Sequence, residues 1–234
     1  MKQRILTIGA HPDDADFGTA GTMQKFAREG YEIYYLICTN GDKGGARNSH
    51  TPGDLVRIRR REQKNAASMV NAREVFFLNN SDGELVPDKN LKREIVRVIR
   101  KVKPDKVFSF DPANLTFESF YLFHTDHRAV AVSVFDSIYP AAKNIMYFPE
   151  LLDEGLEPHK VKELFTYGTH KPNIWFDISA DMDKKLEMIK CHASQFQAKR
   201  FEEVRKHIYD IAREAGAHKG YGLAEAFRVI TFPF

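Results

Sequence analysis

The sequence predicts an α/β fold in which a Rossmann-like, mostly parallel sheet is flanked by helices in three layers. Short apolar runs alternate along the chain with longer stretches whose apolar residues recur every three or four positions. No linker rich in proline, glycine or serine interrupts this alternation. We therefore expect a single domain, with a βαβ core in residues 1–150 and an extension in residues 151–234 that completes it.

The predicted elements follow one another in a regular order. Strands are expected at residues 5–9, 33–39, 75–78, 106–110 and 145–148, with helices beginning near Gly18, Asp54, Lys89 and His127. Further strands are expected at residues 164–167, 174–178 and 227–231, with a helix from 180 to about 196 and a charged helix to about 215. Right-handed crossovers place the carboxyl ends of parallel strands along one edge of the sheet.

The most informative motif, Ala10-His11-Pro12-Asp13-Asp14, follows the first predicted strand. In open α/β sheets, ligands bind beyond the carboxyl ends of the strands. His11 and Asp14 can converge there on one metal ion and leave Asp13 beside it as a general base, as a zinc hydrolase requires. Alternatively, the motif is only a turn whose aspartates cap the next helix.

A second cluster, His124-Thr125-Asp126-His127, opens a later helix. Catalytic zinc usually has three protein ligands, so either histidine can complete the set. We assign His127 to the metal and His124 to the reacting carbonyl or leaving group, although spacing alone does not decide between them. Asp126 would fix the tautomer of His124 and favour its protonated form, or it would only cap the helix.

The sequence resembles the LmbE-like or PIG-L-like N-acetylglucosaminyl deacetylases, a zinc-dependent family. Blocks that carry the resemblance occur in the family's order over most of the chain. They lie at residues 10–14 with Gly18 and Gly21, and at 39–41, 59–62, 81–85, 124–127, 170–173, 177–179, 194–196 and 224–227. Two positions depart from the pattern: Thr125 replaces the usual proline, and Asp16 replaces a frequent glutamate.

The resemblance implies an enzyme that removes the acetyl group from a small molecule containing N-acetylglucosamine. His11, Asp14 and His127 would bind Zn²⁺, a ligand set that also accepts other divalent ions. Asp13 would be the general base. A related amidase acting on a larger conjugate is the alternative.

Further roles follow from the same resemblance. His124, supported by Asp126, would stabilise the oxyanion or protonate the leaving amine. Substrate contacts are implied for Arg59, Asn40, Gly41 and His170. Arg59 could instead belong to a solvated helix face formed with its charged neighbours at 57–62. A homo-oligomer, either a trimer or a hexamer, is also implied without a fixed number.

The composition and charge of the sequence argue against nucleic acid and membrane as partners. The net charge of +3 with dispersed lysine and arginine gives no reason to expect nucleic acid, and no apolar run is long enough to span a membrane. The start of the chain leads into a strand without a signal-peptide core, so we expect a cytoplasmic protein. Cys38 and Cys191 are expected to be reduced.

A non-enzymatic nucleotide-binding module is the rival interpretation. The segment Gly18–Gly21 lacks the G-x-G-x-x-G spacing, and paired carboxylates at the first turn would repel a pyrophosphate. A noncatalytic metal-binding relative is a further alternative.

Overall fold

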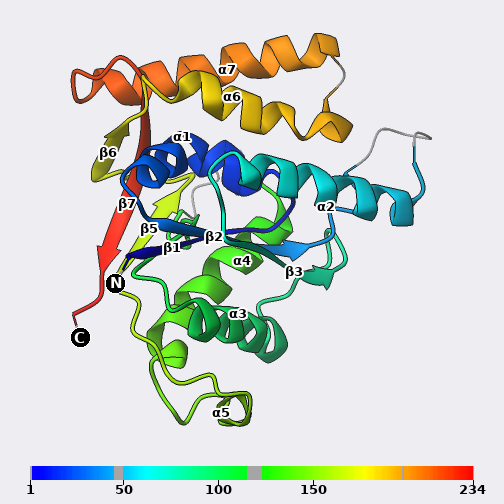
Figure 1. Cartoon of the computed structure of the whole chain (residues 1–234), viewed down its shortest axis with the longest axis vertical. Coiled ribbons are helices and arrows are strands. Elements are labelled where there is room, and N and C mark those ends of the chain that lie inside the picture. The colour runs from blue at the N-terminus through cyan, green and yellow to red at the C-terminus, as the bar shows by residue number, and fades with distance from the viewer. Residues whose placement is uncertain (1, 45–49, 115–122, 197, 234) are drawn as a thin grey trace.

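The computed structural model describes residues 2–44, 50–114, 123–196 and 198–233. Seven strands form one sheet with helices on both faces (Figure 1). The strands are β1 (Arg4–Gly9), β2 (Glu32–Thr39), β3 (Glu74–Asn80), β4 (Lys106–Phe110), β5 (Glu163–Tyr167), β6 (Ile174–Asp177) and β7 (Ala224–Thr231). Their spatial order is β3-β2-β1-β4-β5-β7-β6. The first five are parallel, whereas β7 runs antiparallel to β5 and β6. The predicted fold class is confirmed.

Seven α-helices are described. They are α1 (Asp14–Arg28), α2 (Pro52–Ser68), α3 (Lys89–Val102), α4 (Thr125–Asp136), α5 (Glu150–Asp153), α6 (Met182–Lys190) and α7 (Ala198–Ala217). Helices α1 and α2 lie on one face of the sheet, with α6 and α7 on the same side, and α3 and α4 cover the other face (Figure 1). No helix of the described ranges is both long enough and apolar enough to cross a membrane.

The centre of the sheet is buried on both faces. In β1, Ile5, Leu6 and Ile8 have no exposed surface, and neither do Val107 and Phe108 in β4. Such burial on both faces explains why these two strands are mostly apolar and do not alternate between apolar and charged residues.

The strand predicted at residues 145–148 is wrong. Ile145 and Met146 are exposed, and Phe148 has a φ of 54°, which no regular strand allows. The buried guanidinium of Arg100 in α3 donates to the backbone carbonyls of Asn144 and Tyr147. Because these carbonyls face a helix, this segment does not join the sheet, and β5 occupies the place beside β4.

Two glycines of α1 allow other elements to approach the helix closely. A Cβ at Gly18 would lie 2.8 Å from the ring of Tyr167, and one at Gly21 would lie 2.8 Å from Ile178. The Tyr167 ring cannot easily retreat, since it is buried and its hydroxyl donates to the carbonyl of Ile8 at 2.8 Å.

We expect Gly18→Ala to destabilise the protein by about 1–3 kcal/mol, because the added methyl group overpacks a rigid contact. Urea denaturation would measure the change. Gly53→Ala in α2 is the matched control, since a Cβ there meets no atom within 4 Å. That control should be neutral or stabilising by up to about 1 kcal/mol. Equal stability of the Gly18 variant and wild type would contradict the packing argument.

Candidate metal centre and active site

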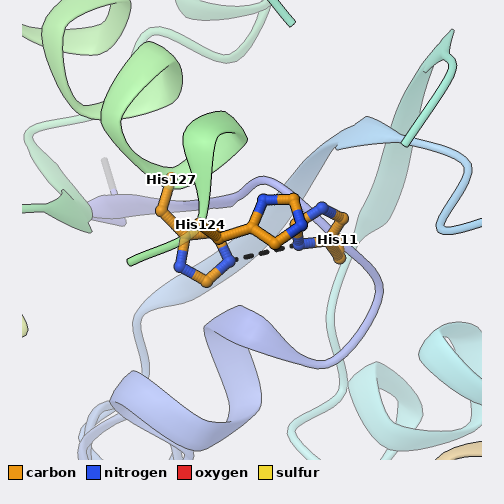
Figure 2. Close-up of side chains that lie close together, drawn as sticks. All are labelled: His11, His124 and His127. Atoms are coloured by element: carbon orange, nitrogen blue, oxygen red, sulfur yellow. Dashed lines mark hydrogen bonds between the residues drawn. The ribbon is translucent and has the colours of Figure 1, made fainter. Parts of the chain in front are cut away.

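The two predicted clusters meet beyond the carboxyl ends of the strands. His11 lies two residues after the end of β1, whereas His124 and His127 lie at the start of α4. Their three rings point toward one another from these separate segments (Figure 2). Asp82, in the turn that follows β3, adds a carboxylate to the group.

Two histidine nitrogens and one carboxylate form a close triangle of groups. Nδ1 of His11 and Nε2 of His127 are 3.2 Å apart, and they lie 3.2 Å from Oδ2 and from Oδ1 of Asp14, respectively. Tetrahedral zinc with bonds of about 2.0–2.1 Å separates its ligand atoms by about 3.3 Å. The triangle therefore fits a tetrahedral metal ion with a fourth position left for water or substrate.

The position of His124 differs from that of His127. Its side chain is 41% exposed, against 11% for His127. Its Nδ1 accepts the backbone N–H of Asp126 at 3.2 Å and thereby caps α4. His11, His124 and His127 can still offer nitrogen atoms within 4.8 Å of one another. The tighter triangle with Asp14 nevertheless favours His127 as the metal ligand.

His11 is surrounded by carboxylates. Its Nε2 lies 3.1 Å from oxygens of both Asp82 and Asp126. Burial lowers the pKa of His11, but the charge of Asp14 and the hydrogen bonds of all three carboxylates raise it well above its usual value. A carboxylate behind a ligating imidazole fixes the ring and increases its basicity toward a metal.

The carboxylate of Asp126 lies closer to the ring of His11 than to the ring of His124. It accepts the N–H groups of Gly83 and Leu85 at 2.7 and 3.1 Å, and its nearest oxygen lies 4.0 Å from Nδ1 of His124. Burial and the neighbouring histidines lower the pKa of His124 despite Asp126. The charge of Asp126 does raise the pKa of His124, as expected, but burial and the other two histidines outweigh it. At Nδ1 the ring meets the backbone amide of Asp126 rather than its carboxylate.

Asp13 adopts an uncommon backbone conformation beside the triangle. Its φ is 117°, in a region that side chains other than glycine rarely enter. Burial raises the pKa of its carboxyl group, and the charge of Arg59 opposes that rise. Strained residues of this kind cluster at functional sites.

Arg59 is buried rather than part of a solvated helix face. It is 3% exposed, and its guanidinium donates to the carboxylate of Asp13 at 3.1 Å and to the carbonyls of Pro12 and Gly41. Gly41 has a φ of 62°, and a Cβ there would lie 2.3 Å from Nη1 of Arg59. The structure thus shows Arg59 holding Asp13, while its contact with substrate stays a prediction.

Two further predicted substrate residues, Asn40 and His170, lie in the loops that follow β2 and β5. The side chain of Asn40 donates to the carbonyl of Asn79 at 3.1 Å and accepts from Arg60 at 3.0 Å. His170 lies half-buried in the loop after β5. The roles of Asn40, Gly41 and His170 toward substrate stay predictions.

Sequence reasoning did not single out two residues of the site. Asp82 was included only within the block at residues 81–85, although its position after the third strand is the signal that places it at the shared edge. Gln63, which accepts the N–H of Asp13 at 3.0 Å, carries no signal of its own within a charged helix.

Comparisons with known proteins agree with this geometry. Residues 6–138 match the family model "PIG-L: GlcNAc-PI de-N-acetylase". The chain is 32% identical over 228 residues to the diacetylchitobiose deacetylase of Thermococcus kodakarensis, covering 97% of this chain and 83% of that protein. The chain belongs to the PIG-L family. Within it, the protein is a deacetylase, that is, an amide hydrolase.

Two further relatives show the range of similar proteins. The N,N'-diacetylchitobiose deacetylase of Pyrococcus horikoshii, solved with its inhibitor MPG, aligns with a TM-score of 0.91 at 32% identity, covering 98% of this chain and 84% of that chain. The 4-oxalmesaconate hydratase of Pseudomonas putida is 24% identical over 238 residues, covering 98% of this chain and 86% of that protein.

We expect His127→Ala to lose its bound metal, because only two of the three close donors remain. His124→Ala should keep the metal, since the Asp14 triangle is intact. Metal analysis after gel filtration would measure the content of both variants, with His207→Ala, an exposed residue of α7, as the control. Loss of metal from the His124 variant would make His124 a ligand instead.

Proposed function

We propose that the protein is a zinc-dependent N-deacetylase acting on a small molecule that contains N-acetylglucosamine, such as a diacetylated chitobiose. The triangle of His11, Asp14 and His127 beside the carboxylate of Asp13 is the observation that carries this proposal. The names of the similar deacetylases support the substrate class.

Each part of the site has a role in this reaction. Bound zinc would supply a Lewis acid for the amide carbonyl and the attacking water. Asp13 takes the proton of that water as general base. Because Arg59 donates to Oδ2 of Asp13, Oδ1 is the carboxylate oxygen that accepts the proton. The same proton then passes from Asp13 to the nitrogen of the departing amine. The products are acetate and a free amine.

His124 is suited to the developing negative charge on the carbonyl oxygen. Because its Nδ1 accepts the Asp126 amide, the neutral ring carries its proton on Nε2. That N–H can donate to the oxyanion. A neutral imidazole also agrees with the lowered pKa of this residue, which burial and the neighbouring histidines cause.

We expect Asp13→Asn to retain zinc and to lose roughly a hundredfold or more in turnover, the usual size of a general-base contribution. The measurement is acetate release under saturating substrate, with metal content determined on the same samples. A variant that keeps the full rate would exclude Asp13 as the base.

We also expect chelation to abolish acetate release and added zinc to restore it. The assay uses a panel of N-acetylglucosamine compounds, from the monosaccharide to diacetylchitobiose, with the Asp13→Asn variant as the control. Hydration of an unsaturated carboxylic acid is tested in a separate assay that follows loss of the double bond, because one relative is a hydratase. Release of no acetate from any compound by zinc-loaded protein would contradict the proposed substrate class.

A further inference from the structure

A chain of buried hydrogen bonds leads from the C-terminal part of the protein to the backbone of Asp13. The N–H of Asp13 donates to Oε1 of Gln63 at 3.0 Å, and Nε2 of Gln63 donates to Oδ2 of Asp16 at 2.8 Å. Nε2 of His192 lies 2.8 Å from the same oxygen of Asp16. Gln63, Asp16 and His192 have no exposed surface.

The donor and acceptor groups of these residues fix the direction of each hydrogen bond in the series. A carboxylate only accepts hydrogen bonds, so Gln63 must turn its NH₂ group toward Asp16 and its carbonyl oxygen toward Asp13. His192 must then donate through Nε2. A reversed Gln63 amide would place two donors face to face at Asp13 and two acceptors face to face at Asp16. The carboxylate of Asp16 therefore sets the orientation that Asp13 requires.

The conformation of Asp13 needs such support. A φ of 117° persists in an L residue only where the surroundings hold it. On the carbonyl side, Asp13 accepts the N–H groups of Asp16 and Phe17 at 2.9 and 3.0 Å, at the start of α1. On the amide side, Gln63 provides the hydrogen bond. Asp13 is thus held at both of its peptide groups.

His192 is itself anchored to the helix that carries Gln63. It follows the end of α6 at Lys190, where sequence analysis predicted that the helix continues to about residue 196. Two residues later, the backbone N–H and the hydroxyl of Ser194 donate to the carboxylate of Glu62 at 2.8 and 2.7 Å. The segment after α6 is therefore bonded directly to Glu62 of α2, and it reaches the adjacent Gln63 through Asp16 of α1.

We propose that His192, acting through Asp16 and Gln63, is a positioning residue that holds the backbone of Asp13 and so aims its carboxylate. The consequence for catalysis rests on the proposed function, in which Asp13 is the base. The effect on the Asp13 backbone does not depend on the substrate. A purely structural role for the Asp16–His192 pair would lower stability without a specific effect at Asp13.

The test combines amide hydrogen exchange at Asp13 with kinetics. His192→Leu and Gln63→Met each interrupt this series of hydrogen bonds, whereas His192→Gln keeps a donor for Asp16. We expect the Asp13 amide to exchange about tenfold faster or more in the first two variants. Turnover should fall roughly tenfold to a hundredfold, with KM and zinc content unchanged. His192→Gln should recover both values.

His159→Leu is the matched control, because His159 is also largely covered and its Nε2 lies 2.8 Å from the carbonyl of Pro104, before β4. It should change neither the exchange of the Asp13 amide nor turnover. Unchanged exchange in folded His192→Leu protein, or an equal effect in the control, would overturn the proposal. If wild-type protein releases no acetate but Asp13 exchange still depends on His192, the positioning role stands and the proposed function fails.

Discussion

Three buried carboxylates converge on the imidazole of His11, and the arrangement of the site depends on how their charge is balanced. Asp14 lies at Nδ1 of the ring, whereas Asp82 and Asp126 lie at Nε2. Buried carboxylates are costly unless they are paired with a cation or well hydrogen-bonded. A metal ion at Nδ1 would satisfy this need and leave the Nε2 proton to the other two carboxylates. Sheet topology makes the convergence possible, because it brings the turns after β1 and β3 and the start of α4 to one edge.

Helix α2 links this centre to the rest of the molecule through its buried polar face. Arg59 holds the carboxylate of Asp13, Gln63 holds its amide, and Glu62 binds Ser194 from the C-terminal part. The metal triangle and the base therefore depend on different supports. The triangle is built by the turn after β1, the first residue of α1 and the first turn of α4. The proposed base, Asp13, is held by α2, to which the segment after α6 is bonded.

The fold by itself does not specify the reaction, since proteins of similar structure include both deacetylases and a hydratase. What distinguishes a deacetylase is a base placed to activate water and a donor placed at the developing oxyanion. In the proposed reaction, Asp13 would activate the water and Nε2 of His124 would donate to the oxyanion. Their geometry, rather than the sheet, supports amide hydrolysis.

The parallel core and the two histidine motifs could be predicted from the amino-acid sequence, because each depends on residues that are neighbours in the chain. His11, Asp13 and Asp14 occupy one turn, and His124 and His127 occupy one helix start, so local patterns were enough to find them. The folded structure was needed to find that His127 lies beside Asp14, that Arg59 is buried, and that Asp82 and Gln63 belong to the site. It also showed that residues 145–148 face a buried arginine instead of joining the sheet. These features arise from contacts between segments far apart in the chain, for which local periodicity carries no information.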